Sequence, residues 1–118
     1  MNIGVCEGRH VVQTNDGEGM HYYLFENPVE SPCDLDGHEK RCREFIRDKI
    51  IPAGIFAQYL EYRDINLYIT GLTPLVTSFL KCWTERQERL EMTCGDLVLW
   101  HWNKETEQYK PQNWAVIT

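Results

Sequence analysis

The sequence predicts an α/β fold, in which helices pack on a small and mostly parallel β-sheet with an antiparallel edge. An apolar run at residues 65–69 is followed by a glycine turn and by an amphipathic helix that begins near Thr73. A second apolar run, at residues 97–102, follows that helix. A strand, a crossover helix and a further strand form the unit from which parallel sheets are built. Pro111 lies in the last predicted strand, which we therefore place at the edge of the sheet.

Two strands are expected before this central unit. Residues 2–6 and 21–25 are apolar or aromatic, and both segments favour a β-strand. The segment at residues 27–36 carries two prolines and is interpreted as a loop.

A helix is expected at residues 37–51, and Pro52 and Gly54 are expected to end it. Residues 55–62 fit a short helix slightly better than a strand. The inner stripe of the helix is predicted from its apolar positions, which are Cys42, Phe45, Ile46 and either Lys49 or Ile50.

The central strand, at residues 65–69, is apolar enough to be covered on both faces. Gly71 supplies the backbone freedom that a sharp turn needs. Thr73 is a suitable N-cap, and Pro74 fits the first helical position, where its missing N–H costs nothing. The charged segment 84–91 is expected to lead out of the helix. One face of the helix is apolar at helical spacing, through Leu75, Val76, Phe79, Leu80 and Trp83.

The C-terminal part of the chain is predicted to complete the sheet. The next strand is residues 97–102, which fit better than the alternative at residues 90–93. Residues 103–108 form a turn, and residues 109–117 a returning edge strand. If the strands at 65–69 and 97–102 are parallel neighbours, the helix between them should make a right-handed crossover.

The length and charge of the chain limit its function. A chain of 118 residues suits one domain, residues 1–118, with a core of its own. The net charge of −6 argues against binding to long DNA or RNA, because such proteins need a basic face. A small anionic ligand needs only a few local donors and is not excluded by this charge.

The sequence indicates a cytoplasmic protein. It has no run of about 18 apolar residues that could span a membrane, and its N-terminus lacks the basic and apolar segments of a signal peptide. Its five cysteines are an odd number at irregular spacing, which is typical of reduced thiols rather than of a disulfide framework.

The best candidate for a ligand site is the segment Thr70, Gly71, Leu72 and Thr73. It connects the central strand to the N-terminus of a helix, and ligands of open α/β sheets bind at this carboxyl edge. Hydroxyl groups and free N–H groups there suit a phosphate or a ribose. The alternative is structural, with Thr73 only capping the helix and Gly71 only turning the chain.

Two further segments are candidates for chemistry. Gly8, Arg9 and His10 follow the strand at residues 2–6. If that strand neighbours the central one, Arg9 would hold a phosphate and His10 would act as an acid or base. The alternative is an exposed loop pair. His101 lies between two tryptophans and is either a packed core residue or a second catalytic or base-stacking residue.

No metal site and no cofactor are predicted. Cys33, His38 and Cys42 have the spacing C-x4-H-x3-C, and thiolates and imidazoles bind zinc, but no C-x2-C pair completes the set. The serine-hydrolase elbow, the Walker loop and the dinucleotide-binding glycine motif are absent. Trp102 and Trp114 lie near predicted turns, where a tryptophan can stack on a base or form a dimer contact instead of joining the core.

The segment 66–74, Asn-Leu-Tyr-Ile-Thr-Gly-Leu-Thr-Pro, resembles the strand and T-G-G-T-K signature of the CRISPR-associated Rossmann-fold (CARF) domains and of the small ring nucleases of that group. The resemblance implies a Rossmann-like homodimer that holds a cyclic oligoadenylate across its two-fold axis, in antiviral defence or in phage counter-defence. It assigns ligand contacts to Thr70, Gly71 and Thr73. It also implies cleavage without a metal, by in-line attack of a ribose 2′-hydroxyl. Leu72 replaces the second signature glycine and Pro74 the signature lysine, which affects catalysis more than binding.

Three hypotheses of function follow. The first is a homodimer that binds a cyclic or linear oligonucleotide signal, and that slowly cleaves or sequesters it. The second is an interaction protein without a small ligand, whose acidic surface and exposed tryptophans engage a protein partner. The third is a monomeric enzyme that acts on a free nucleotide or a phosphorylated sugar at the same edge of the sheet.

Overall fold

The computed structural model describes residues 1–7, 14, 17, 19–25, 31–52, 64–69, 73–88 and 97–114. The chain divides into two compact units. The sheet unit comprises Met1–Pro28, Asp64–Gly71 and Asp96–Thr118, and the helical unit comprises Val29–Arg63 and Leu72–Gly95.

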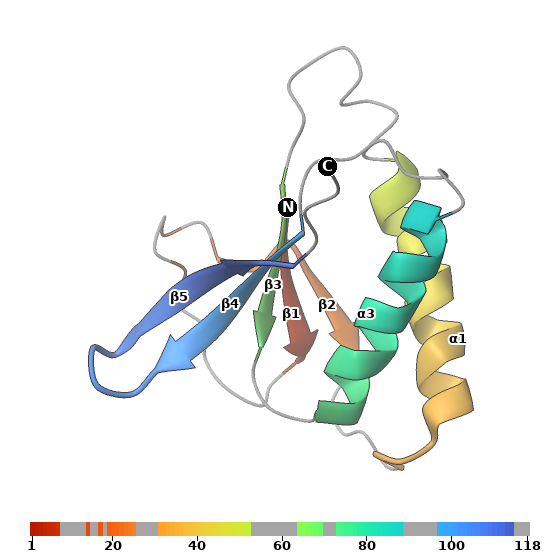
Figure 1. The fold of residues 1–118 in the computed structure, drawn as a ribbon, viewed down its shortest axis with the longest axis horizontal. Helices are drawn as coiled ribbons and strands as arrows, with labels where there is room; N and C mark the ends of the chain where they lie inside the picture. The colour runs from red at the N-terminus through yellow and green to blue at the C-terminus, as the bar shows by residue number, and fades with distance from the viewer. Residues whose placement is uncertain are drawn as a thin grey trace. The chain divides into compact units, whose positions relative to one another are not determined.

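The described residues of the sheet unit form a five-stranded sheet in the order β2-β1-β3-β4-β5 (Figure 1). The strands are β1 Asn2–Cys6, β2 Tyr22–Phe25, β3 Ile65–Ile69, β4 Leu97–Asn103 and β5 Gln108–Asn113. The pairs β1–β2, β1–β3 and β3–β4 are parallel, and β5 is antiparallel to β4. The predicted α/β class, with a mostly parallel sheet and one antiparallel edge, is confirmed.

The strand bounds lie close to the predicted ones. β1 and β3 have the predicted bounds, and β2 begins at Tyr22, one residue later than expected. β4 extends to Asn103, one residue farther. β5 begins one residue early and ends at Asn113, while the last predicted strand residues, 115–117, lie outside the described part of the chain.

Side chains alternate between the two faces of the sheet, and Cα partners on adjacent strands share a face. Leu67 is the partner of both Ile3 and Leu99. Their common face, here called the aliphatic face, carries Ile3, Val5, Leu24, Ile65, Leu67, Ile69, Leu97 and Leu99. All of these except Ile69 are at most 3% exposed. Burying each such side chain contributes about 1.5–3 kcal/mol, which makes this face a main source of stability.

The opposite face, here called the aromatic face, is formed by the rings of Tyr23, Tyr68, Trp100, Trp102 and Tyr109. Tyr68 stacks on its partner Trp100 at 5.5 Å between ring centroids, and Tyr109 meets Tyr68 edge-on at 5.0 Å. The ring of Tyr23 covers Gly4 so closely that a Cβ atom at Gly4 would lie 2.7 Å from it. Gly4 therefore allows the Tyr23 ring to lie against the backbone of β1.

The antiparallel strand β5 forms one edge of the sheet, and Pro111 lies in its interior opposite Trp100. A proline has no N–H for the hydrogen-bond ladder, so it is tolerated in an edge strand and poorly tolerated in a central one. The edge position predicted from Pro111 is confirmed.

The helical unit begins with α1, Leu35–Phe45, which continues as a π-helical turn, η1, at Ile46–Ile50. Asp34 caps α1, because its Oδ1 accepts a hydrogen bond from the backbone N–H of Gly37 at 3.2 Å. The predicted helix at 37–51 is present, and it begins two residues earlier than expected. The buried residues Cys42, Phe45, Ile46 and Ile50 form the predicted inner stripe, to which the exposed Lys49 does not belong.

The predicted end of this helix at Ile51 is wrong, because Pro52 is still helical. In a regular α-helix the proline ring clashes with the carbonyl oxygen four residues before it. The backbone N–H of Ile51 instead bonds to the carbonyl of Ile46, five residues back. This wider turn lies directly before Pro52, where it relieves the clash.

The second helix, α3, spans Thr73–Glu88. The predicted apolar face is present, with Leu75, Val76, Phe79 and Trp83 buried and Leu80 half-buried. The expected exit from the helix at Thr84 is wrong, since α3 continues to Glu88. The added residues include Glu85, Arg86 and Gln87, and such residues have high helix propensity even where they bury little surface.

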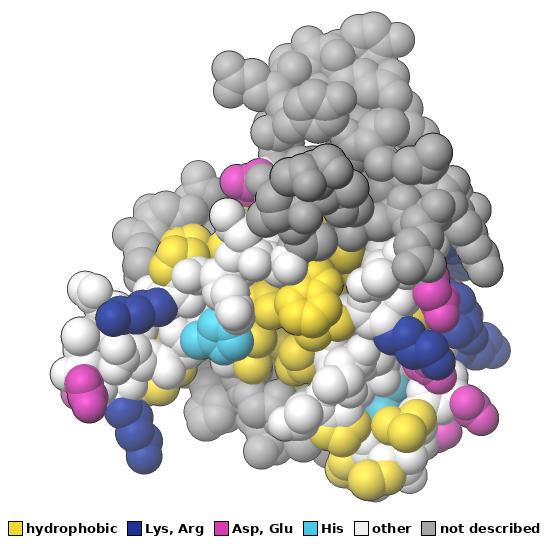
Figure 2. Space-filling model, in the orientation of Figure 1, with side chains coloured by type: hydrophobic (Ala, Val, Ile, Leu, Met, Phe, Trp, Pro, Cys, Tyr) yellow, Lys and Arg dark blue, Asp and Glu magenta, His cyan; other side chains and the backbone are white. Residues whose placement is uncertain are grey.

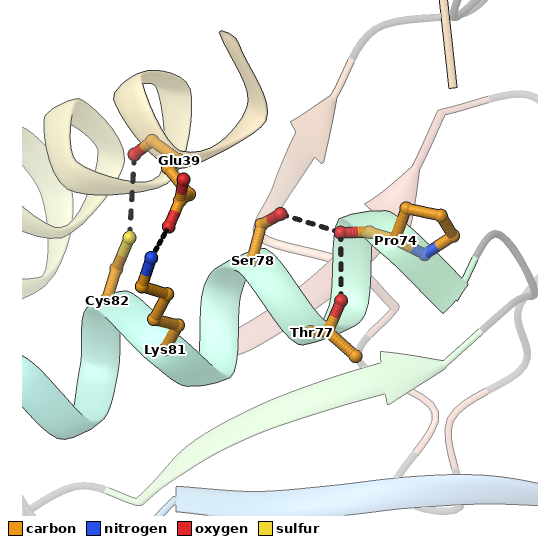
Figure 3. A network of polar contacts seen from close by, with 6 residues as sticks. All are labelled: Glu39, Pro74, Thr77, Ser78, Lys81 and Cys82. Atoms are coloured by element: carbon orange, nitrogen blue, oxygen red, sulfur yellow. Dashed lines mark hydrogen bonds and ion pairs between the residues drawn. The ribbon is translucent and has the colours of Figure 1, made fainter. Parts of the chain in front are cut away.

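α1 and α3 pack against each other within the helical unit. The thiol of Cys82 donates to the carbonyl oxygen of Glu39 at 3.5 Å, and Lys81 forms an ion pair with the Glu39 carboxylate (Figure 3). The Glu39 side chain is only 14% exposed, whereas that of Lys81 is 61% exposed. Lys81 is therefore a surface residue whose ammonium group links α3 to α1.

Candidate functional site at the carboxyl edge of the sheet

The strand order creates a topological switch point between β1 and β3. The chain passes from β1 to β2 on one side, and from β3 to β4 on the other, although β1 and β3 are adjacent and parallel. The connections therefore leave these two strand ends in opposite directions. In open α/β sheets, ligands bind outside the carboxyl ends of the strands at such a point.

The two predicted ligand segments begin at the switch point. Gly8, Arg9 and His10 follow β1, and Thr70, Gly71 and Leu72 follow β3 directly. All six lie outside the described residues, so their side-chain positions stay predictions. The sequence predicts that these two segments share a site if the first strand neighbours the central one. β1 and β3 are indeed adjacent and parallel, so this condition is met.

Glu7 is a charged residue of this edge that the sequence reasoning missed. Its backbone N–H donates to the carbonyl oxygen of Phe25 at 2.9 Å, which extends the β1–β2 pairing beyond Cys6. Its side chain is exposed. The signal in the sequence was its place directly after an apolar strand. A carboxylate at this edge increases the need for a cation such as Arg9 if the ligand is an anion.

His101 is the one predicted catalytic residue that the structure describes. It is the Cα partner of Ile69, the last residue of β3, and it lies on the aliphatic face. Its side chain is exposed, so the interpretation as a packed core histidine is wrong. It lies two residues beyond Leu99, which is 3% exposed, so the imidazole follows the buried part of β4.

A hydrogen bond holds the imidazole of His101. Its Nε2 lies 2.9 Å from Oε1 of Gln112, which comes from the neighbouring strand β5. This contact orients the ring, and Nδ1 lies outside it. Gln112 is a second residue of this edge that the sequence did not single out, because its contact with His101 depends on the register of a hairpin.

Trp102 lies one residue beyond His101, on the aromatic face. Its Cα partner is Tyr109, and the two rings meet edge-on at 5.2 Å between centroids. Trp102 is 50% exposed. At the other end of the same pair of strands, Trp114 is 42% exposed, and its backbone N–H donates to the carbonyl of Leu97 at 2.9 Å. The two exposed tryptophans therefore lie at opposite ends of the β4–β5 hairpin.

Thr73 begins α3, one residue earlier than the first helical position expected from Pro74. It is exposed, and its carbonyl oxygen accepts a hydrogen bond from Oγ1 of Thr77 at 3.2 Å. The hydroxyls of Thr77 and Ser78 also donate to the carbonyl of Pro74, at 3.2 and 2.7 Å (Figure 3). Both hydroxyls therefore bond to carbonyl groups within α3. Among the first four residues of α3, Thr73 is the one that carries a hydroxyl group.

Cys33, His38 and Cys42, whose spacing resembles that of metal ligands, have separate surroundings in the structure. Nε2 of His38 bonds to the carbonyl oxygen of Pro32 at 2.8 Å. Cys42 is fully buried, and this burial, with the nearby Cys82, raises the pKa of its thiol well above the usual range. Cys33 is exposed. Among the described residues, no group of three or more His, Cys, Asp or Glu side chains could hold a metal ion.

Charges of both signs are mixed along α1 and η1. Arg47 and Asp48 form a salt bridge at 2.7 Å, and the Arg47 hydrogen bond holds the pKa of Asp48 below its usual value. Figure 2 shows acidic side chains among the basic ones where Figure 1 places α1. This mixed surface differs from the continuous basic face of a protein that binds long nucleic acids.

Comparison with protein-family models, with curated proteins and with solved structures gave no match to this chain. Among the described residues, no helix is long and apolar enough to cross a membrane. The functional assignment therefore depends on the geometry of the sheet edge and on the sequence of the segments that leave it.

Proposed function

We propose that this chain binds a cyclic oligonucleotide second messenger of the cyclic oligoadenylate class at the carboxyl ends of β1 and β3. The observation that supports this proposal is the switch point between these strands. The two segments that the sequence marked for anion binding follow these two strands in the sequence. Such a ligand carries phosphates, riboses and bases, and so it can use the donors, hydroxyls and aromatic groups of this edge.

Each segment has a role in the proposal. Thr70, Gly71, Leu72 and Thr73 bind phosphate or ribose through backbone N–H groups and hydroxyls. Gly8 allows close approach of the backbone, and Arg9 neutralises phosphate charge next to the exposed Glu7.

Cleavage of the ligand is the second part of the proposal. A base removes the proton of a ribose 2′-hydroxyl, the oxygen attacks the adjacent phosphorus, and an acid protonates the leaving 5′-oxygen. His101, whose Nε2 is held by Gln112, and His10 are the candidates for these roles. Because Pro74 stands where the CARF signature has lysine, we expect this cleavage to be slow, so that binding alone would sequester the signal.

A homodimer fits a cyclic ligand, because a ring with two-fold symmetry is bound best by two copies of one edge. Size-exclusion chromatography with light scattering, with and without ligand, measures this state. A role in antiviral defence or in phage counter-defence follows from the ligand class.

A thermal-shift screen against cyclic di-, tri-, tetra- and hexanucleotides tests the proposal. A ligand that binds only the native state raises the melting temperature. We expect a saturable rise with at least one cyclic oligoadenylate, reduced in Arg9→Ala and in Gly71→Ala. Lys40→Ala, which removes an exposed cation on α1, is the matched control. A protein that binds none of the panel would disprove the proposal.

A protein-interaction module, for example an inhibitor in counter-defence, is the second candidate. The exposed apolar side chains of Leu35, at 51%, and Trp114, at 42%, favour it. This candidate predicts that the cyclic nucleotides leave the melting temperature unchanged. It also predicts that Leu35→Ser or Trp114→Ser abolishes the biological activity while the protein stays folded.

A further inference from the structure

Trp102 lies near the carboxyl end of β3, which precedes the predicted binding segment. Ile69 of β3 pairs with His101 of β4, and Trp102 is the next residue of β4. Within the described residues, Trp102 and Asn103 pair with Tyr109 and Gln108 of β5. Trp102 is therefore one residue beyond the partner of Ile69, and Ile69 directly precedes the predicted segment 70–73 in the sequence.

A neighbouring ring supports the side chain of Trp102. The ring contacts Tyr109 edge-on at an interplanar angle of 65°, and Tyr109 itself is 6% exposed and packs edge-on against Tyr68. Trp102 nevertheless keeps 50% of its surface exposed. A rigidly supported indole that is half open to solvent loses little conformational entropy when a flat group stacks on it.

The surroundings of Trp102 favour a single flat ligand group over a broad apolar partner. The neighbouring His101 is exposed and polar, and the turn that follows carries Lys104, Glu105 and Glu107, all exposed. These side chains make no apolar patch around the indole. The exposed cations here, Lys104 and Lys110, lie among the carboxylates of Glu105 and Glu107, so we expect stacking to contribute more than charge at this position.

We propose that Trp102 stacks on a base of the ligand whose phosphates bind the segments after β1 and β3. This inference rests on the proposed function and specifies how its ligand is recognised. Stacking on a tryptophan is tolerant of base identity, because every base has a π face. Trp102 thus adds affinity, while the discrimination between bases lies with other groups.

Titration with cyclic tri-, tetra- and hexa-adenylate by isothermal calorimetry tests the inference. We compare wild-type protein, Trp102→Phe, Trp102→Leu and Trp114→Leu. Trp114 is the matched control, because it is similarly exposed but lies at the amino end of β4. Stacking predicts that Trp102→Leu raises the Kd about 10-fold to 100-fold, that Trp102→Phe raises it less, and that Trp114→Leu leaves it unchanged.

Tryptophan fluorescence gives a second readout on the same samples. Ligand should quench the emission of wild-type protein and of Trp114→Leu, and most of this quenching should be lost in Trp102→Leu. Equal Kd values for wild-type protein and Trp102→Leu would overturn the stacking role and leave the proposed function intact. Failure of the wild-type protein itself to bind would overturn both.

Discussion

Asn2 and Asn66 are Cα partners on β1 and β3, and Nδ2 of Asn66 donates to Oδ1 of Asn2 at 3.0 Å. Nδ2 of Asn2 also donates to the carbonyl oxygen of Gly19, and Oδ1 of Asn66 accepts from Nε1 of Trp100, each at 3.0 Å. This chain of hydrogen bonds crosses three adjacent strands. A slip of one residue would turn every side chain of a strand to the other face and break these bonds, so the asparagine pair favours the observed register of β1, β3 and β4.

Asn66→Ala should destabilise the protein. The substitution leaves Asn2 without a donor and the Trp100 indole without its acceptor, and such part-buried orphaned groups cost about 1–3 kcal/mol. Urea denaturation measures the change. Asn113→Ala is the control, because Asn113 lies on the same face but is exposed, and it should change the unfolding free energy by less than about 0.5 kcal/mol. Equal effects of the two substitutions would contradict this role of the asparagine pair.

Gly4→Ala should also destabilise the protein, by about 1–3 kcal/mol, because overpacking forces neighbouring groups to move. The added methyl would lie 2.7 Å from the Tyr23 ring. A double-mutant cycle with Tyr23→Ala separates the causes. If the clash with the ring is responsible, Gly4→Ala should cost much less in the Tyr23→Ala background, and an unchanged cost would place the strain elsewhere.

Gly37→Ala should have two opposing effects on stability, because it raises the helix propensity of α1 and disturbs its Asp34 cap. Alanine is favoured over glycine in a helix by about 0.8–1 kcal/mol. At this position, however, its Cβ would lie 2.3 Å from Oδ2 of Asp34, and an N-cap is worth about 0.5–2 kcal/mol. We expect Gly37→Ala to give no stabilisation in the wild-type chain and a clear stabilisation in the Asp34→Ala background. Thermal melts of the four proteins decide this, and a stabilising effect in both backgrounds would show that the cap tolerates the methyl group.

Tyr109 should make the free energy of unfolding depend on pH in the alkaline range. Burial raises the pKa of its phenol in the folded state. Since the folded-state pKa lies above the unfolded value of about 10, the contribution is complete below that pH and is lost as pH rises through the folded-state pKa. Tyr109→Phe should therefore lose less stability than wild-type protein between pH 9 and 11, as measured by urea denaturation at each pH. Parallel losses in the two proteins would contradict this assignment.

The strands could be predicted because their signals are local. Apolar runs such as 65–69 are long enough to identify, and Pro111 marks an edge by its missing N–H alone. The ends of the helices were harder. The π-helical turn before Pro52 depends on a backbone adjustment that residue type does not reveal, and the charged residues at the end of α3 suit both a helix and an exit from it.

The site was predicted only in part, since its members come from separate strands. Residues 70–73 are recognisable as a turn before a helix, but the contact between His101 and Gln112 follows from the register of β4 with β5. The position of Trp102, one residue beyond the partner of Ile69, likewise depends on the register of β3 with β4. The candidate residues could be selected from the sequence. Which of the described candidates lie at the same edge of the sheet depends on how the strands pair.

Chemical-shift mapping of ¹⁵N-labelled protein with cyclic tetra-adenylate tests the central claim most directly. Binding at the switch point predicts the largest changes at the carboxyl ends of neighbouring strands, in the backbone amides of Glu7, Ile69 and Trp102. The amino ends of the same strands, including Asn2 and Leu97, should change little. Changes confined to those amino ends, or a spectrum that saturating ligand leaves unaltered, would contradict the proposed site.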